Sequence, residues 1–463
     1  MLELKGKYNK DCKIFCDDIE KGALSDIYNL LDQPISEGVP IRIMADVHAG
    51  KGGNVVGFTM PMTNMVDPNM IGVDISCSVT GAFFRTEKGF DLPKLDMEIR
   101  RNVPFGMNVH EIPLVSDFPF DEAQQRVDIF TSMYNKKYNT NYQPPIFNQK
   151  WLTKKLKEIG MEERIFWCSL GSVGGGNHAC ELGVNENGEH LLMIHCGSRN
   201  FGLKIANYHS NQSKKQVNFS QDEYSKRLND IVMNTSDKKD IPHLIKSLKE
   251  EMNIGINRDY LRDDYMFDYL CDVVFVSVYT HLNHTLILEE IRKILGIKTF
   301  DNVIETVHNY IDFSDNNFMI RKGAVSAKKD EVVLIPISMK FGTLVCRAKG
   351  NEDYNFSLNH GAGRLMSRSK AKELFSLEQM QESMKGIYCQ LNKNVVDESC
   401  FAYKKPDFII KSIEPNADII SIYKPILNLK DIGKSESFKE RKLQKKKREL
   451  DRDSERRMKR RDY

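Results

Sequence analysis

Long hydrophobic runs are missing from this 463-residue sequence. It contains no stretch of about 18 consecutive apolar residues, which is roughly what a membrane-spanning helix requires. The amino-terminal sequence "MLELKGKYNKDCKIF" also lacks the apolar segment of a secretory signal peptide. These absences predict a protein that is neither inserted into a membrane nor sent through one, and we expect it to be cytoplasmic.

Closely spaced cysteines are scarce. The sequence has ten cysteines, but Cys12 and Cys16 are the only close pair and no C-x-x-C occurs. Zinc fingers need such pairs, and disulfide frameworks belong mainly to short secreted chains with denser cysteines. We therefore expect reduced thiols, and any cysteine with a chemical role is expected to be a metal ligand or a nucleophile.

The net charge is small, +3, and it is distributed unevenly. Residues 434–463 contain 14 Lys or Arg and 7 Asp or Glu, a net of +7, which leaves −4 for residues 1–433. Because this segment has almost no apolar residues, we expect a basic tail that is either a solvated helix or disordered. A polyanion such as RNA is its natural partner, and a solvated end without a function is an equal alternative.

Repeats and linkers rich in Gly, Pro or Ser are absent from the body of the chain, which favours one compact unit. The apolar runs at 164–170 (RIFWCSL), 190–195 and 331–339 predict buried strands. Residues 266–295 predict a long helix with an apolar stripe at spacings of three or four, formed by Phe267, Leu270, Val274, Val278, Leu282 and Leu286. The polar segment at about 210–262 predicts a surface helical insertion.

Polar residues suited to chemistry gather in Gly- or Asn-containing loops at the predicted strand ends, where a scaffold presents functional groups. Six segments share this character: "MADVHAGKG" with Asp46 and His48, "GVDISC" with Asp74 and Cys77, "GGGNHACE" with Asn177, His178 and Glu181, "HCGSRNFG" with His195 and Arg199, "ETVHNY" with His308, and "NHGAGRLMSRSKAK" with His360.

Taken singly, each of these histidines is more often structural than a ligand. Together, Asp74, Cys77, His178, His195 and His308 offer one carboxylate, one thiolate and three imidazoles. This donor set could form two neighbouring metal sites that share the thiolate.

The order of these segments, followed by "IPISM", "DES…AYK" and "PILNLK", resembles that of the RtcB-type RNA ligases from about residue 40 to Lys430. The resemblance implies a GTP- and manganese-dependent ligase that joins an RNA 3′-phosphate or 2′,3′-cyclic phosphate end to a 5′-hydroxyl end, in tRNA splicing or RNA repair. It implies an α+β fold, with a single large RtcB-like catalytic domain at residues 1–433. This domain is expected to have central mixed or antiparallel sheets and a metal site at strand-end loops.

The resemblance also assigns roles to residues. Asp74, Cys77 and His178 would hold one Mn²⁺, Cys77, His195 and His308 the other, and His360 matches the histidine that becomes guanylylated. An imidazole suits this role because it is a neutral nucleophile near pH 7 and leaves well afterwards. The positions that match the nucleotide site are Asn177, Glu181, Ser338, Gly361, Ala362, Gly363, Arg364, Tyr403 and Lys430. Arg199 and Arg368 would contact RNA or phosphate.

The sequence departs from the family pattern at a few positions. Ser76 stands where a glycine is usual, Ala179 where an aromatic residue follows Asn-His, His284 where an arginine follows Asn, and Ile337 lies in an altered "PGSMG" pattern. The metal ligands and the nucleophile are retained. We therefore expect these departures to affect the rate, the end preference or the nucleotide stringency.

Two other function classes are open at this stage. A metallo-phosphoesterase that opens cyclic phosphates would use the metal ligands but has no use for His360. An RNA-end binding protein would use the basic tail and the arginines, and it would leave the metal ligands unexplained. The resemblance also leaves open whether an activator such as archease is needed.

Overall fold

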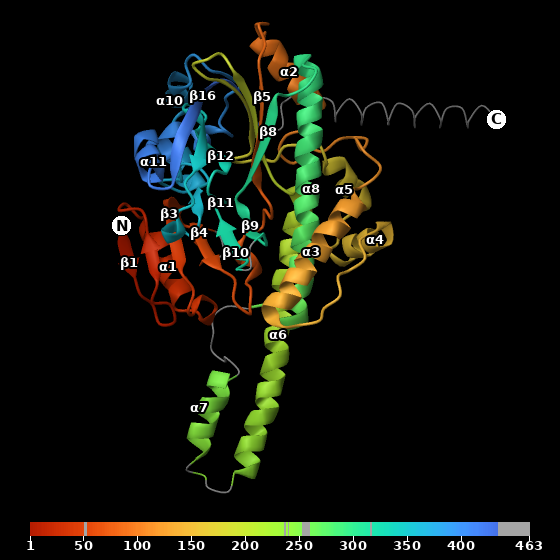
Figure 1. Ribbon diagram of the computed structural model, residues 1–463, viewed down its shortest axis with the longest axis vertical. Helices are drawn as coiled ribbons and strands as arrows, with labels where there is room; N and C mark the ends of the chain where they lie inside the picture. Colours follow the sequence, from red (N-terminus) through yellow and green to blue (C-terminus); the bar gives the residue numbers. More distant parts are fainter. Residues whose placement is uncertain (51–52, 236–237, 239, 252–259, 315–316, 434–463) are drawn as a thin grey trace, which may run out of the picture.

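Two large sheets and a group of long helices make up the protein in the computed structural model (Figure 1). The structure describes residues 1–50, 53–235, 238, 240–251, 260–314 and 317–433. Helices and sheets are not arranged in alternating β-α-β units, and most neighbouring strands are antiparallel, so the fold is α+β. The predicted fold class is therefore confirmed. The predicted basic tail, residues 434–463, lies outside the described residues.

The first sheet has six strands in the order β1-β2-β3-β4-β10-β9 and is mixed, because β2 and β3 are parallel and its other pairs are antiparallel. Its central strand β3 has the sequence IRIMADVH and is buried almost throughout. The strands are β1 (Leu2–Leu4), β2 (Cys12–Ile14), β3 (Ile41–His48), β4 (Val56–Pro61), β10 (Met319–Lys322) and β9 (Asn309–Asp312).

The second sheet has the order β12-β13-β16-β6-β7-β5-β8, and its two ends approach each other. The backbone N–H of Leu334 in β12 donates to the hydroxyl of Thr306 in β8 at 3.0 Å, so the sheet curls into a nearly closed barrel. The strands are β12 (Val332–Ser338), β13 (Gly342–Ala348), β16 (Ala417–Lys430), β6 (Ala179–Val184), β7 (His190–Cys196), β5 (Ser78–Phe84) and β8 (Asn302–Val307), with β15 (Tyr388–Cys389) beside β16. A small pair, β11 (Ala324–Ser326) and β14 (Ser357–Asn359), lies apart from both sheets in the pairing order.

The longest helix in the core is α8 (Asp263–Leu295), which lies alongside α3 (Phe120–Tyr138) in Figure 1. The predicted helix at 266–295 is confirmed. Phe267, Leu270, Val274 and Val278 are buried, and Leu282 and Leu286 pack partly buried against the same core. The stripe therefore anchors the helix to the sheets, as its spacing predicts.

The strand prediction is correct for 190–195 and 331–339, which become β7 and β12, but wrong for 164–170. That run forms helix α5 (Glu163–Ser169), with Phe166, Trp167, Cys168 and Ser169 buried. The ring of Phe166 packs edge-on against Phe201 at 5.0 Å and lies 4.9 Å from Tyr279. A short apolar run suits either a strand or a buried helix, so packing against these helical neighbours decides it.

The remaining helices lie around the sheets, and one pair extends away from them. Helix α6 (Arg199–Asn234) runs far beyond the body of the protein, and α7 (Ile241–Glu251) lies beside its outer end (Figure 1). Helix α7 and most of α6 fall in the range of about 210–262 predicted as a polar helical insertion, of which residues 236–237, 239 and 252–259 are not described. The other helices are α1 (Lys21–Leu31), α2 (Leu92–Asn102), α4 (Gln149–Glu158), α9 (Arg368–Leu374), α10 (Leu377–Ser383) and α11 (Pro406–Ile413).

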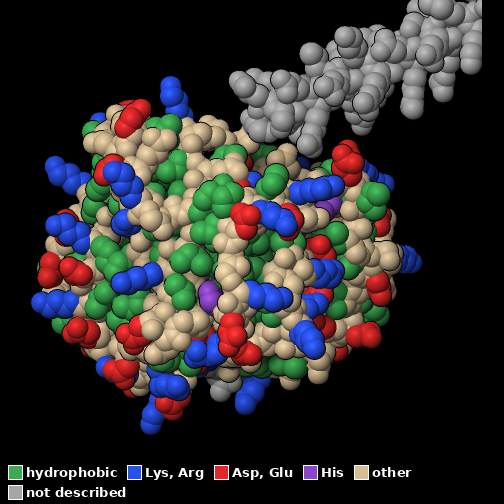
Figure 2. Space-filling model, turned by 90° about the horizontal axis from the view of Figure 1, so that it is seen from above, with side chains coloured by type: hydrophobic (Ala, Val, Ile, Leu, Met, Phe, Trp, Pro, Cys, Tyr) green, Lys and Arg blue, Asp and Glu red, His purple; other side chains and the backbone are tan. Residues whose placement is uncertain are grey.

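Charges of both signs are interspersed on the face seen from above, with hydrophobic side chains between them (Figure 2). Among the described residues, no helix combines the length and the apolar character needed to cross a membrane. All ten cysteines are free thiols, as the sequence predicts.

Candidate functional site

The loop before β5 brings Asp74 and Cys77 to one end of the barrel. Ser76 lies between them with φ 59°, a left-handed conformation that is uncommon for a residue other than glycine. Its N–H donates to the carbonyl of Asn309 at 2.7 Å, and the N–H of Cys77 donates to the carbonyl of Asp74 at 3.2 Å. This tight turn explains why a glycine is expected at position 76, and serine adopts it at some cost in backbone strain.

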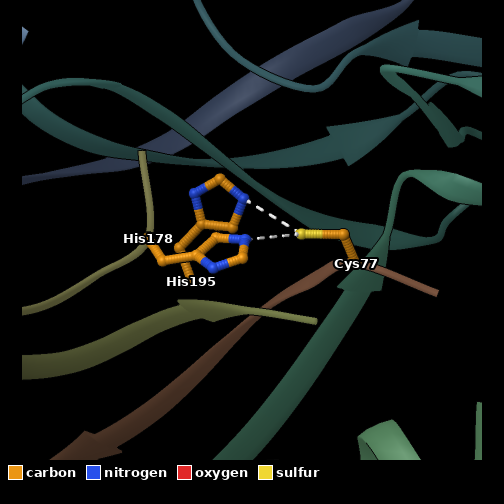
Figure 3. A group of neighbouring side chains, drawn as sticks. All are labelled: Cys77, His178 and His195. Atoms are coloured by element: carbon orange, nitrogen blue, oxygen red, sulfur yellow. Dashed lines mark hydrogen bonds between the residues drawn. The ribbon is translucent and has the colours of Figure 1, made fainter. Parts of the chain in front are cut away.

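Three histidines come from strands of the same sheet as β5, and two of them, His178 and His195, reach the Cys77 thiol. His178 directly precedes β6, His195 lies in β7, and His308 follows β8. Nε2 of His178 lies 3.3 Å from Sγ of Cys77, Nε2 of His195 lies 3.5 Å from it, and the two imidazoles approach the sulfur together (Figure 3). Nε2 of His195 also lies 3.3 Å from Nε2 of His308.

Asp74 completes this group, because its Oδ2 lies 2.9 Å from Nε2 of His178. Although burial opposes it, His178 lowers the pKa of the Asp74 carboxyl, which favours the ionised form. Burial, with some help from His308, lowers the pKa of His195 well below its ordinary value. A neutral imidazole is the form that binds metals.

The group fits a metal site on its chemistry. The ligand atoms of Cys77, His178 and His195 all lie within 4.8 Å of one another and all three residues are buried. Burial raises the pKa of the Cys77 thiol well above its ordinary value, so a cation that binds here has to displace the thiol proton. The Cys77 thiol and the two imidazole nitrogens beside it are donors that suit a transition metal, and Asp74 and His308 add a carboxylate next to His178 and an imidazole next to His195.

His360 lies beside this cluster, with its ring 5.0 Å from the ring of His308. The residue directly follows β14, and Asp46 near the end of β3 holds it. Oδ2 of Asp46 lies 2.6 Å from Nδ1 of His360 and accepts hydrogen bonds from the N–H groups of His360 and Gly361, at 3.1 and 3.3 Å. A carboxylate at Nδ1 keeps the proton on that nitrogen and leaves the lone pair on Nε2.

The glycine-rich turn after His360 is required by close packing on β3. Gly363 has φ 72°, and a Cβ at this position would lie 2.1 Å from the backbone oxygen of Asp46. No other residue could adopt this conformation so close to the strand. The turn therefore holds the loop of His360 against Asp46.

A cavity of about 690 Å³ opens next to His360. Every position that the sequence assigns to the nucleotide lines this cavity: Asn177, Glu181, Ser338, Gly361, Ala362, Gly363, Arg364, Tyr403 and Lys430. His195, His360 and Arg368 line it as well. Segments far apart in the sequence thus bring the residues predicted for the nucleotide to one cavity.

At one wall of the cavity, Glu181 is buried between two strands. Its carboxylate accepts hydrogen bonds from Nδ2 of Asn428 at 2.7 Å and from the hydroxyl of Thr343 at 3.3 Å. Burial raises the pKa of Glu181 to about 8, although Thr343, Lys430 and Asn428 oppose the shift. Ala179, two residues earlier on β6, also lines the cavity and adds only a methyl group to this wall.

Glu398, which also lines the cavity, gathers three cations. Its carboxylate lies 3.0 Å from Nζ of Lys430, 2.6 Å from Arg368 and 3.2 Å from Arg364. It also accepts a hydrogen bond from the hydroxyl of Tyr403 at 2.9 Å. Burial alone would raise the pKa of Glu398, but Lys430, Arg368 and Arg364 lower it to about 2.

Arg199 is placed differently from the other predicted phosphate contacts. It begins α6, and its guanidinium donates to the carbonyl of Gly106 at 2.6 Å and to the hydroxyl of Ser172 at 3.0 Å. Among the described residues that line the cavity, Arg199 does not appear. It lies behind His178, because a Cβ on Gly174 would meet both His178 and Arg199.

Three residues at the site are not among the residues assigned from the sequence. Asp46 stands in the segment "MADVHAGKG", but the sequence gives no sign that its partner is His360. Glu398 precedes Tyr403 in the segment "DES…AYK", and Asn428 precedes Lys430 on β16. For Asp46 and Glu398, the sequence offered one indication of a role at the site. Each is a carboxylate in a segment that contains other matched residues.

His284, where the family pattern has arginine, packs behind the metal cluster. Its Nδ1 lies 2.7 Å from the hydroxyl of Thr80 and its Nε2 lies 3.1 Å from the carbonyl of Cys196. It thus links α8 to β5 and β7, the strands next to Cys77 and His195. Its role in this structure is to support those strands.

Comparison with known proteins finds a family model and several relatives that cover most of this chain. The family model described as "tRNA-splicing ligase RtcB" matches residues 36–431. The RNA-splicing ligase RtcB of Escherichia coli (strain K12) is 26% identical over 417 residues, covering 84% of this chain and 90% of that protein. The tRNA-splicing ligases RtcB of Nanoarchaeum equitans and Archaeoglobus fulgidus are 23% and 24% identical and cover 84% and 85% of this chain, with 87% of each relative covered.

Proposed function

Because this chain belongs to the tRNA-splicing ligase RtcB family, and is thus an RNA ligase, we propose that it uses GTP and Mn²⁺ to join RNA ends. The ends are a 3′-phosphate, or a 2′,3′-cyclic phosphate opened to a 3′-phosphate, and a 5′-hydroxyl. The observation that carries the proposal is the His360–Asp46 pair, which lies beside the thiol and imidazole cluster and lines the same cavity as the predicted nucleotide residues.

In the first step, Nε2 of His360 attacks the α-phosphorus of GTP, and the bond to the β-phosphate breaks to release pyrophosphate. Asp46 supports the step because it holds the proton on Nδ1 and directs the lone pair of Nε2. As the ring gains positive charge in the phosphoramidate, the same carboxylate stabilises that charge. His360 then carries GMP.

In the second step, an oxygen of the RNA 3′-phosphate attacks the phosphorus of GMP and displaces His360. In the third, the 5′-hydroxyl of the other RNA end attacks the activated 3′-phosphate and displaces GMP, which leaves a phosphodiester bond. The guanylate thus serves as a leaving group, since a phosphate monoester is a poor electrophile without one.

Two groups of residues would offset the negative charge of the phosphates in these steps. Asp74, Cys77 and His178 would hold one Mn²⁺ and Cys77, His195 and His308 a second, and such ions neutralise and orient phosphate oxygens. Arg364, Arg368 and Lys430 bring three further cations to the cavity, held in place by Glu398. Glu181, Asn177 and Tyr403 are the residues we assign to the guanine nucleotide.

Tests of end joining separate this function from the two alternatives. An RNA whose 3′-phosphate is ³²P-labelled is incubated with a 5′-hydroxyl RNA, GTP and Mn²⁺. The ligase function predicts that the label enters a longer product and becomes resistant to phosphatase. A metallo-phosphoesterase would act on a cyclic-phosphate RNA without lengthening it, and a binding protein would shift the RNA in a gel and leave it chemically unchanged. Either outcome would contradict the proposal.

A further inference from the structure

Three exposed apolar side chains belong to segments that line the cavity next to His360. Leu365 is 43% exposed and lies between Arg364 and Met366, both of which line the cavity. Phe401 is 49% exposed and Leu374 is 51% exposed. We call Leu365, Leu374 and Phe401, with Phe375 behind them, the rim patch.

The other two members of the rim patch also belong to segments that reach the cavity. Phe401 lies between Glu398 and Tyr403, and Leu374 ends α9, whose first residue Arg368 lines the cavity. All three segments therefore contribute both a wall residue and an exposed apolar residue. The rim patch therefore belongs to the segments that form the cavity wall.

The ring of Phe401 packs against a second aromatic ring. Its centroid lies 5.7 Å from that of Phe375, with the planes inclined by 42°. Phe375 packs in turn against the cluster that contains the buried Met339 and Met380. The backbone N–H of Leu365 donates to the carbonyl of Ala402 at 2.9 Å. This hydrogen bond joins the segment of Leu365 to the segment of Phe401. The ring is thus fixed in place while about half of its surface faces solvent.

Cations flank the rim patch on α9. The side chains of Arg368, Lys370 and Lys372 are 41%, 56% and 47% exposed. Lys370 and Leu374 are one helical turn apart, so they lie on the same face of α9. Lys370 pairs with Glu373 where both side chains are exposed, so this pair is weak and leaves Lys370 available to a phosphate, whereas Arg368 and Lys372 pair with the buried Asp397.

We propose that the rim patch is a stacking platform for an unpaired nucleobase next to the reacting RNA end, and that Phe401 is the ring on which this base stacks. Single-stranded nucleic acid is recognised by aromatic side chains that stack on bases and by cations that follow the backbone. Phe401 offers the aromatic ring, and α9, which directly precedes the Phe375 that contacts this ring, offers the cations Arg368 and Lys370. The inference rests on the proposed function, since the base that stacks here belongs to an RNA end that reacts at His360.

The test uses single-stranded RNA that ends in a 3′-phosphate and carries the fluorescent base 2-aminopurine one to four nucleotides from that end, without GTP. Stacking on an aromatic ring quenches this base. The wild-type protein is expected to quench it at one or two of these positions. Phe401→Ala is expected to lose the quenching and to bind the RNA about 5- to 100-fold more weakly, from the usual energy of base stacking on an aromatic side chain.

Two further variants control the result. Phe401→Trp keeps an aromatic surface and is expected to retain binding. Tyr28→Ala removes a comparably exposed aromatic ring, 41% exposed on α1, and is expected to bind RNA like the wild type. Labelling of His360 by GTP is measured in every variant, because it needs no RNA. If the wild type is not labelled, the proposed function fails, and this outcome is distinct from failure at the rim patch.

Two results would overturn the inference. Phe401→Ala could bind RNA as tightly as Tyr28→Ala with the quenching unchanged, which would leave the rim patch to a protein partner. Alternatively, Phe401→Ala could lose labelling by GTP together with RNA binding, which would show that the ring only supports the loop of Glu398 and Tyr403.

Discussion

Oδ2 of Asp46 lies 2.6 Å from Nδ1 of His360, although the two residues are 314 positions apart in the sequence. Asp46 belongs to β3 of the first sheet, and His360 follows β14. The same oxygen accepts hydrogen bonds from the N–H groups of His360 and Gly361. One carboxylate therefore fixes the position of the His360 loop and the orientation of the His360 ring. The orientation of the proposed nucleophile therefore depends on how the His360 loop packs against β3.

Asp46→Asn tests this relationship. The amide keeps the size of the side chain but removes the negative charge that holds the Nδ1 proton and stabilises the charged ring. We expect the single-turnover rate of guanylylation to fall by about 10²- to 10⁴-fold, the usual range for a lost acid–base partner. Asp418→Asn, a change in a 72% exposed carboxylate, serves as the control and should leave the rate unchanged. Equal rates in the two variants would contradict the role of Asp46.

Cys77 is predicted to be the shared ligand of the two metal sites. Its sulfur lies within 3.5 Å of Nε2 of both His178 and His195, so its loss affects both sides of the cluster. Cys77→Ala should lower the number of Mn²⁺ ions bound per chain more than His178→Ala, as measured by equilibrium dialysis with metal analysis. The same stoichiometry in both variants would argue against a shared thiolate.

The lowered pKa of Glu398 predicts how the stability of the protein depends on pH. Its pKa is lowered from about 4.5 to about 2, so its ionised form contributes stability that is fully present above pH 4.5 and is lost as the pH falls towards 2. Glu398→Gln should lower the free energy of unfolding at pH 7 by on the order of 3 kcal/mol. Denaturant unfolding between pH 7 and pH 2 measures this. The variant should lose less stability than the wild type between pH 4.5 and 2, and parallel curves would contradict the assignment.

The residues around Cys77 and along the cavity could be picked out from the sequence because each lies in a short segment that resembles a segment of the family. His178 and Lys430 illustrate this, since each stands in a matched segment and each reaches the site in the structure. Asp46 also lies in such a segment. Its partner His360 could not be predicted, because the contact joins two different sheets. A sequence records which residues are present, and only the packing of β3 on the His360 loop shows that they meet.

The secondary structure shows the same limit. Helix α8 could be predicted because its apolar stripe persists over many turns. Helix α5 could not, since seven residues with Phe166 and Trp167 at adjacent positions have no clear period. The contacts of Phe166 with Phe201 and Tyr279 come from α6 and α8, which lie far away in the sequence. Such tertiary packing outweighs the local preference for a strand.

The basic tail provides a further prediction, because residues 434–463 carry a net charge of +7. If the tail binds RNA through phosphates, its deletion should weaken RNA binding at low salt. It should also flatten the slope of log affinity against log salt by roughly 0.7 to 0.9 per lost phosphate contact. Filter binding at several salt concentrations measures both. An unchanged slope would show that the tail is a solvated end, and guanylylation of His360 should be unaffected in either case.

The central claim is that His360 becomes covalently guanylylated. The most direct test incubates the protein with Mn²⁺ and GTP labelled at the α-phosphate, followed by denaturing electrophoresis. We expect label on the wild-type chain that is lost in acid and stable in base, as a phosphoramidate requires, and none on His360→Ala. His360→Ala should still join RNA that already carries a 3′-guanylate, because the task of the nucleophile is then complete. Label that persists on His360→Ala would contradict the account.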